Sequence, residues 1–341
     1  MKILVTGAAG FIGYHVCTLL LKQGHLVTGI DNLSAYYDLN LKKGRLQDLG
    51  VACDKDGIQE NGNFSFQVLD MNDRAGMEKL FVHCDFDRVI HLAAQPGVRY
   101  SVEQPESSIR ENIMPFLNLL ECCVACKIPH TIFASSSSVY GLTKQSPFTE
   151  SDPTSHTVSI YAASKKMNEQ MAHTYSKMYQ LPLTGLRFFT VYGPWGRPDM
   201  AIYLFSKALF NNEPLKVFNN GEMARDFTYV DDITHSISLL IDQVPQAETE
   251  LNVGNSTDGP FAIYNIGSGR PTRLMDFIDA LENETGKKAN IEMLPMQKGD
   301  VVETFASIDK LDQTIAYRPQ TKLEDGIRSY VEWFKEYYQV N

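Results

Sequence analysis

A tyrosine and a lysine four positions apart, Tyr161 and Lys165, are the side chains of this sequence best suited to acid–base chemistry. In a helix this spacing places both on one face, within reach of each other. A tyrosine with a pKa near ~10 has to lose about three pKa units, equivalent to about 4 kcal/mol, before it acts as a base at neutral pH. We therefore predict that the Lys165 ammonium stabilises the Tyr161 phenolate. The pair alone also fits a chance arrangement on an amphipathic helix.

A run of serines, residues 135–138, follows an apolar stretch upstream of this pair. Ligands of open α/β sheets bind at the carboxyl ends of strands, where we expect these hydroxyls. Ser136 is the candidate that hydrogen-bonds a substrate hydroxyl and exchanges a proton with Tyr161, and Ser137 and Ser138 are expected to line the same wall. A polar turn with capping serines is the alternative. A serine nucleophile is not expected, because the sequence has no Gly-x-Ser-x-Gly elbow.

The N-terminal segment predicts the element that brings a cofactor to these side chains. A short apolar strand leads into Gly7, Gly10 and Gly13 and then into a helix. Gly7 permits a tight turn, Gly10 a close approach of phosphate, and Gly13 close packing of the helix on the strand, with the helix N-terminus facing the phosphates. Asp31 ends the next apolar run, where a carboxylate accepts hydrogen bonds from a ribose 2′-hydroxyl. Because no arginine directly follows Asp31, the pattern favours NAD over NADP.

Apolar runs that fit buried parallel strands recur along the first half of the chain, with helical stretches between several of them. This alternation predicts a doubly wound α/β fold with a parallel Rossmann sheet. The predicted strands are Ile3–Val5, Leu26–Ile30, Phe64–Leu69, Arg88–Leu92, Thr131–Ala134 and Leu183–Phe188. The polar segment 32–63 is expected to form a helix and a loop beside the cofactor.

The pattern changes after Gly193, where we predict a smaller, interleaved α/β substrate lobe. Residues 1–190, completed by about 226–268, are expected to form the dinucleotide-binding domain, and 191–225 with 269–341 the second lobe. The elements predicted in this half are a helix over 200–210, a strand around 215–218, a strand over 227–232 that feeds a helix over 233–243, a strand over 262–266 and a helix over 272–285.

Composition narrows the class of protein further. The 341 residues carry a formal net charge of −10, which argues against a general nucleic-acid binder. A core strand follows Met1 almost at once and no apolar run approaches about eighteen residues, so we expect a cytoplasmic protein without a membrane segment. The six cysteines show no metal-ligand spacing joined to histidine, and no metal site is expected. The cluster Cys122, Cys123 and Cys126 is interpreted as small buried thiols.

Taken together, these motifs resemble the extended short-chain dehydrogenase/reductase family over almost the full length. The resemblance also includes His91-Leu92-Ala93-Ala94, the segment 187–194 and Arg225-Asp226-Phe227. Within the family, the segments 31–38, 197–200 and 218–223 are most similar to UDP-glucuronate 4-epimerases. The resemblance implies a UDP-sugar substrate, NAD as cofactor and a homodimer paired through helices near 113–126 and 161–179.

The resemblance also implies roles for individual residues. Asp70 is expected at the adenine amine with Met71 beside the ring, and Lys165 is expected to hold the nicotinamide ribose in addition to its role beside Tyr161. The full expected cofactor set is Gly7, Gly10, Phe11, Ile12, Gly13, Asp31, Asn32, Asp70, Met71, Leu92, Ala93, Ala94, Tyr161 and Lys165. The expected substrate set is Ser137, Ser138, Thr190, Arg197, Phe218, Arg225 and Asp300. In this set Thr190 and Arg197 are placed near a sugar carboxylate, and Arg225 at the diphosphate.

The activity implied is NAD-dependent C4 epimerisation of UDP-glucuronate to UDP-galacturonate through a transient 4-keto sugar. The alternatives are an epimerase of neutral UDP-hexoses, a UDP-glucuronate decarboxylase and a non-catalytic NAD-binding sensor. Related decarboxylases tend to carry a glutamate where this chain has Ser138, and dehydratases carry an Asp-Glu pair at 137–138. Arg197 could instead brace the interlobe loop, and Arg225 could form a surface ion pair with Asp226.

Overall fold

The computed structural model describes residues 1–52, 57–143, 145–247, 259–297 and 300–341. Its main element is an eight-stranded sheet with the order β11-β7-β6-β5-β1-β2-β4-β3, in which all neighbours are parallel except the antiparallel edge pair β3 and β4. Its strands are β1 (Lys2–Thr6), β2 (Leu26–Asp31), β3 (Gln59–Asn61), β4 (Phe64–Val68), β5 (Arg88–His91), β6 (Thr131–Ser136), β7 (Leu183–Phe188) and β11 (Phe261–Ile266). The predicted doubly wound Rossmann sheet is confirmed.

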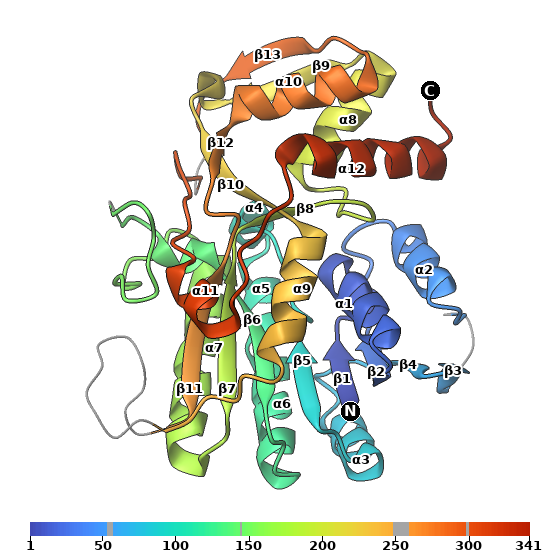
Figure 1. The fold of residues 1–341 in the computed structure, drawn as a ribbon, viewed down its shortest axis with the longest axis vertical. Coiled ribbons are helices and arrows are strands. Elements are labelled where there is room, and N and C mark those ends of the chain that lie inside the picture. Colours follow the sequence, from blue (N-terminus) through green and yellow to red (C-terminus); the bar gives the residue numbers. More distant parts are fainter. Residues whose placement is uncertain (53–56, 144, 248–258, 298–299) are drawn as a thin grey trace.

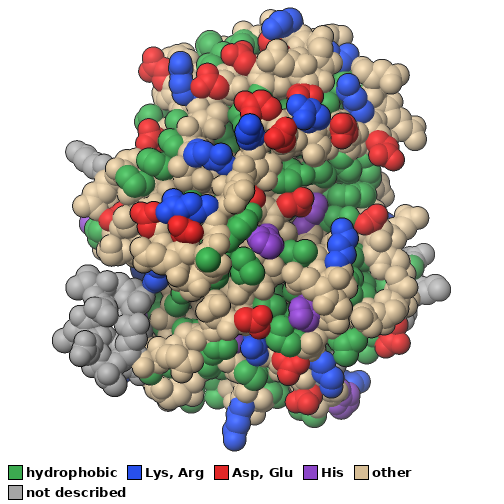
Figure 2. Space-filling view, in the orientation of Figure 1, with side chains coloured by type: hydrophobic (Ala, Val, Ile, Leu, Met, Phe, Trp, Pro, Cys, Tyr) green, Lys and Arg blue, Asp and Glu red, His purple; other side chains and the backbone are tan. Residues whose placement is uncertain are grey.

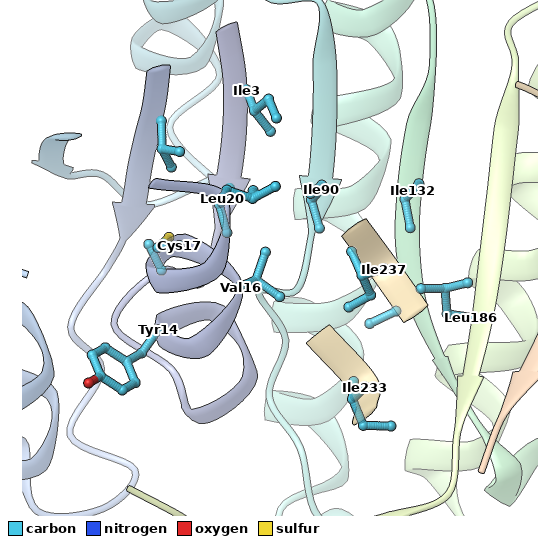
Figure 3. Packing of buried hydrophobic residues seen from close by; sticks show 14 of the residues in the cluster. Ile3, Tyr14, Val16, Cys17, Leu20, Ile90, Ile132, Leu186, Ile233 and Ile237 are labelled. Carbon is cyan, nitrogen blue, oxygen red and sulfur yellow. The ribbon is translucent and has the colours of Figure 1, made fainter. Parts of the chain in front are cut away.

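Helices cover both faces of this sheet (Figure 1). Because successive residues of a strand face opposite sides, Ile3 belongs to one core and Leu4 to the other. The helices α1 (Phe11–Lys22) and α9 (Val230–Leu240) pack on the Ile3 face. Figure 3 shows Val16, Leu20, Ile233 and Ile237 of these helices gathered over Ile90, Ile132 and Leu186 of the strands. The helices α3 (Arg74–Cys84), α6 (Met114–Ala125) and α7 (Ile160–Tyr179) pack on the Leu4 face.

The smaller lobe, at the top of Figure 1, contains two further sheets. One comprises β8 (Thr190–Tyr192), β10 (Ala224–Tyr229) and β12 (Pro271–Arg273), and the other β9 (Pro214–Phe218) and β13 (Asn290–Leu294). The helices α8 (Ala201–Asn211), α10 (Leu274–Thr285) and α12 (Leu323–Tyr338) enclose a core of their own. Strands β8 and β10 pair in parallel although α8 and β9 separate them along the chain. The three-stranded sheet is therefore assembled from separate chain segments, as the predicted interleaved arrangement requires. The domain limits expected from the sequence stay a proposal.

Several boundaries differ from the sequence prediction. Strand β6 continues through Ser136, and only Ser137–Tyr140 form a 3-10 turn, so the serine run lies half in the strand. Helix α9 begins at Val230 because Asp231 and Asp232 occupy its first turn, where carboxylates interact favourably with the helix dipole. The segment 32–63 contains the predicted helix, but also the edge strand β3. The remaining helices are α2 (Leu39–Asp48), α4 (Val98–Glu103), α5 (Pro105–Asn112) and α11 (Asp309–Ile315).

The surface and the cysteines bear on the remaining expectations. Figure 2 shows acidic and basic side chains interspersed over one face of the molecule, most densely over the smaller lobe. Cys122 and Cys123 are buried as predicted, but Cys126 is exposed because it caps the end of α6, so the prediction for it was wrong. Cys53 lies outside the described residues.

Among the described helices, none combines the length and apolar character needed to cross a bilayer. No metal-binding cluster of His, Cys, Asp or Glu occurs in the described part of the chain.

Candidate active site

Two cavities, of about 650 Å³ and about 800 Å³, meet at the carboxyl edge of the main sheet. Every residue expected at the cofactor lines the first cavity. All seven residues expected at the substrate line the second. Both cavities share a wall that includes Ser136, Tyr161 and Arg197. The side chains with acid–base capacity therefore lie where a ligand of one cavity would meet a ligand of the other.

The glycine turn packs so closely against its own backbone and the segment after β5 that no side chain fits at its three glycines. Gly7 adopts φ of +72°, and a Cβ there would lie 2.8 Å from the Ala93 nitrogen. A Cβ on Gly10 would lie 2.9 Å from the Gly7 carbonyl oxygen, and one on Gly13 would overlap that same oxygen. Helix α1 follows directly, and no side chain caps its N-terminus. Backbone N–H groups are thus left to face phosphate oxygens, as the sequence predicts.

Polar side chains gather at the far end of the first cavity. Asp31 is buried, and its carboxylate accepts hydrogen bonds from the Leu33 backbone at 2.8 Å and from Lys42 Nζ at 3.0 Å. Asn32 donates to the exposed carboxylate of Asp70 at 3.2 Å. Lys42 lines the cavity too, but sequence reasoning missed it. It reaches Asp31 from the first turns of α2, eleven positions on, and no motif announces that contact.

The environment of Tyr161 differs from the expected one. Burial raises the pKa of Tyr161, while the Arg197 cation and a hydrogen bond with Ser136 lower it, and Asp199 raises it. Lys165 is fully buried and donates to the Ala134 carbonyl at 2.9 Å, and burial lowers the pKa of Lys165 to about 8. The charge that most lowers the pKa of Tyr161 in this structure is therefore Arg197 rather than Lys165.

A buried ion pair between Glu169 and Arg187 holds the serine run, residues 135–138, in place. The Glu169 carboxylate accepts hydrogen bonds from Ser135 Oγ at 2.7 Å and from Arg187 at 2.9 and 3.0 Å. The Arg187 guanidinium lies over the Tyr140 ring at 4.8 Å, and Tyr140 donates to Asn265 at 2.6 Å. These contacts join the ends of β6, β7 and β11, which positions Ser136. The helical series 161, 165, 169 was the signal that could have identified Glu169.

Three arginines, Arg99, Arg197 and Arg225, line the second cavity. Arg225 donates to the Val301 carbonyl at 2.7 Å and to the Val302 carbonyl at 3.0 Å. The alternative of a surface ion pair with Asp226 is wrong, because Asp226 is fully buried and accepts hydrogen bonds from Ser268, Gly269 and Ala306. The Arg99 guanidinium lies 5.3 Å from the centre of the Phe218 ring and 3.4 Å from an Asp300 oxygen.

Arg99, on α4, was missed by sequence reasoning, because its partners follow more than a hundred residues later. It closes the second cavity from the side of the main sheet. The other expected substrate residues are placed consistently with one pocket: Thr190 begins β8, Phe218 ends β9, and Ser137 and Ser138 lie in the turn after β6.

The model of the NAD dependent epimerase/dehydratase family matches residues 3–254. Protein CapI of Staphylococcus aureus is 47% identical over 99% of this chain and 100% of its own. UDP-glucuronate 4-epimerase 4 of Arabidopsis thaliana is 42% identical over 99% of this chain and 76% of its own. The crystal structure of UDP-glucuronic acid 4-epimerase from Bacillus cereus, in complex with UDP-glucuronic acid and NAD, covers 99% of this chain and 100% of its own at 35% identity, with a TM-score of 0.87. The chain therefore belongs to the NAD dependent epimerase/dehydratase family.

Proposed function

We propose that this protein is a UDP-glucuronate 4-epimerase, which interconverts UDP-glucuronate and UDP-galacturonate with NAD as cofactor. The observation that carries the proposal is the wall shared by the two cavities, which presents Ser136, Tyr161 and Arg197 to both. A dinucleotide in the first cavity and a sugar nucleotide in the second would come together at Tyr161. The similarity to UDP-glucuronate 4-epimerases along the whole chain supports this substrate.

In this reaction Tyr161 accepts the proton of the sugar 4-hydroxyl and returns it at the end. Ser136 lowers the pKa of Tyr161 through a hydrogen bond and lines the second cavity, so we assign it the orientation of the Tyr161 hydroxyl and the sugar 4-hydroxyl. NAD, when bound, supplies a reversible acceptor for the hydride of C4. Once the 4-keto sugar has rotated in the cavity, its opposite face would receive the hydride, which inverts the configuration at C4. The sugar gains and loses the same two electrons, so no external reductant is consumed.

The first cavity provides specific contacts for NAD. We assign the pyrophosphate to the turn of Gly7, Gly10 and Gly13, and the adenosine ribose to Asp31. Asp70 and Met71 border the adenine, with Asn32 joined to Asp70. Lys165 donates to one backbone carbonyl and has two N–H groups left for the nicotinamide ribose. The remaining expected lining residues are Phe11, Ile12, Leu92, Ala93 and Ala94.

The second cavity provides contacts for an acidic sugar nucleotide. We assign the diphosphate to Arg225, the uracil to Phe218 and its ribose to Asp300. The sugar carboxylate then lies near Thr190 and Arg197, since a guanidinium paired with a carboxylate forms strong charge-assisted hydrogen bonds. Ser137 and Ser138 complete this wall without a carboxylate of their own, which favours epimerisation over decarboxylation or elimination of water.

Incubation with UDP-glucuronate deuterated at C4, without added reductant, tests the proposal. We expect UDP-galacturonate to accumulate with the deuterium still at C4, because the hydride returns to the carbon that released it. Nuclear magnetic resonance of the product measures both quantities. Loss of the label to solvent, release of CO₂ with a pentose product, or turnover of UDP-glucose alone would each contradict this function.

Assembly and location complete the proposal. We propose a homodimer in which helices near α6 and α7 pair across a two-fold axis, supported by exposed apolar side chains on α7, namely Ile160, Met167, Met178 and Tyr179. Sedimentation at micromolar concentration checks this assembly, and a monomer would contradict it. The cytoplasmic location stays a prediction, to be checked by fractionation of cells that express the protein.

A further inference from the structure

The loop that carries Arg197 is fastened to the dinucleotide half of the molecule. This loop, residues 193–199, connects β8 to α8. Its Pro194 carbonyl is 2.9 Å from His15 Nε2 on α1, and its Trp195 carbonyl accepts a hydrogen bond from Arg45 on α2 at 2.6 Å. Its last residue, Asp199, accepts a hydrogen bond from Tyr36 at 3.1 Å. The backbone on either side of Arg197 is therefore held from several directions.

The Arg197 side chain is held as firmly as its backbone. Its Nε donates to one oxygen of Asp199 at 2.9 Å, and its Nη2 donates to the other at 2.8 Å. This is a bidentate contact along one edge of the planar guanidinium, the geometry with the greatest directional specificity. Nη2 also lies 3.5 Å from the Met200 sulfur. Within the described part of the chain, the remaining terminal nitrogen, Nη1, makes no hydrogen bond.

Asp199 is well suited to such a supporting role. The Arg197 cation and the Tyr36 hydroxyl hold the pKa of its carboxyl below the usual range, so it stays ionised at neutral pH. One oxygen is shared between Tyr36 and Arg197, which fixes the carboxylate to segments from both halves of the chain. Its side chain is 32% exposed and lines the second cavity, so it stands beside the sugar site.

We propose that Asp199 is a positioning residue that determines preference for acidic sugars, because it occupies one edge of Arg197 and leaves Nη1 for the carboxylate of the sugar. The inference rests on the proposed function and adds a residue to it. A free arginine side chain loses rotamer freedom when it binds a ligand. Asp199 removes that cost in advance, since the guanidinium plane is already fixed before the sugar arrives.

The opposite reading is that Asp199 competes with the sugar carboxylate for Arg197. The two readings predict opposite results. If Asp199 supports Arg197, its loss weakens binding of the acidic sugar. If it competes, its loss strengthens that binding, because the uronate then meets an uncompensated cation. The edge left at Nη1, and the second anchor at Tyr36, favour support over competition.

The test is calorimetric titration of the NAD-loaded protein with UDP-glucuronate and, separately, with UDP-glucose. Asp199→Asn keeps the shape of the side chain and removes its charge, and Tyr36→Phe removes only the second anchor. A matched control is Asp312→Asn, because Asp312 accepts a hydrogen bond from Arg318 at 2.7 Å and lines neither cavity. The quantity compared is the ratio of the two dissociation constants, which general damage to the fold would not change.

We expect Asp199→Asn to weaken UDP-glucuronate about tenfold more than UDP-glucose, since hydrogen bonds to charged groups are worth about that factor or more. Tyr36→Phe shifts the ratio in the same direction by less, and Asp312→Asn leaves it unchanged. An unchanged ratio in Asp199→Asn, or tighter binding of UDP-glucuronate, overturns the proposal. Absence of UDP-glucuronate epimerisation by the unmodified protein would instead overturn the proposed function, so the two failures are distinguishable.

Discussion

The two cavities are built in different ways. The first is formed by the glycine turn and by residues at the carboxyl ends of successive parallel strands of the main sheet, together with side chains from α2, α4, α5 and α7. The second is formed by side chains from α4, the serine turn and several separate segments of the smaller lobe. A backbone cradle recognises what all dinucleotides share, whereas convergent side chains recognise a particular sugar. The contrast explains why cofactor and substrate depend on such different parts of the chain.

The charges of the cavities differ as well. In the first, the buried Asp31 is paired with Lys42 at 3.0 Å. In the second, the arginines contact groups of the smaller lobe: Arg197 pairs with Asp199, Arg225 donates to three backbone carbonyls, and Arg99 contacts Asp300. The arginines of the second cavity are thus oriented by their own segment or by the opposite half of the molecule, while the first cavity combines the glycine turn with the side-chain pair of Asp31 and Lys42.

The largest effect is expected at the wall that both cavities share. Tyr161→Phe removes the hydroxyl that transfers the proton, so turnover of UDP-glucuronate should fall by about 10³-fold. Binding of NAD and of UDP-glucuronate should persist, as measured by titration. Tyr179→Phe, an exposed tyrosine on the same helix, serves as the control. Near-normal turnover by Tyr161→Phe would show that another group is the base.

The next largest effect is expected from a substitution in the glycine turn, which should change the affinity for NAD but not for UDP. In Gly13→Ala the new methyl group overlaps the Gly7 carbonyl, so the turn must move. We expect a loss of about 1–3 kcal/mol in the free energy of unfolding and a weaker affinity for NAD, with the affinity for UDP little changed. Thermal unfolding and separate titrations measure these quantities.

Gly24→Ala provides the comparison, because no atom lies within 4 Å of the added carbon and only its φ of +81° causes strain. It should cost about 1 kcal/mol of stability and leave the affinity for NAD unchanged. Equal affinity of Gly13→Ala and the unmodified protein for NAD would show that the backbone cradle does not recognise the dinucleotide.

Arg197→Ala tests recognition of the sugar carboxylate, at a residue that lines both cavities. Binding of UDP-glucuronate should weaken about 10- to 100-fold, since the carboxylate loses a charge-assisted partner. Binding of UDP-glucose should change much less, and the NAD content of the protein should stay constant. Calorimetric titration with UDP-glucuronate and with UDP-glucose measures the two changes in affinity. The same loss for both would mean that Arg197 braces the loop and does not recognise the carboxylate.

The smallest effect concerns pH. The Arg197 cation lowers the pKa of Tyr161 and the Asp199 carboxylate raises it. Tyr161 must lose its proton to act as a base, so the ascending limb of kcat against pH should move to higher pH in Arg197→Ala and to lower pH in Asp199→Asn. Profiles at saturating UDP-glucuronate measure both shifts. Movement in the same direction would contradict an electrostatic influence of this pair on Tyr161.

The sequence predicted the fold and the first cavity well because their signals are local. The glycine spacing, Asp31 and the strands each depend on neighbours within a few turns of chain. The family, the epimerase activity and NAD, which the resemblance implied, are confirmed. Lys42 and Glu169 were missed although they lie close in sequence to recognised motifs. Nothing in the residue types shows that Lys42 pairs with Asp31 or that Glu169 pairs with Arg187.

The second cavity was harder to predict for a physical reason. Tyr36 and Asp199 are 163 residues apart, and Arg99 and Asp300 are 201 residues apart. Pairs so far apart in the chain leave no local sequence pattern from which the contact could be predicted. The substrate roles that the resemblance implied for Arg197 and Arg225 stay predictions, whereas the structure shows what holds each guanidinium. The role of Lys165 beside Tyr161 stays a prediction.

The contacts of Arg45 limit how the ligand preferences of this protein can evolve. The same guanidinium that reaches Trp195 also donates to the carbonyl of Ala9 in the glycine turn, at 2.8 Å. One buried side chain therefore ties the glycine turn that lines the first cavity to the loop that carries Arg197. A replacement at this position would disturb affinity for two ligands in concert, so new sugar preferences are more accessible through exposed positions in the smaller lobe than through this anchor.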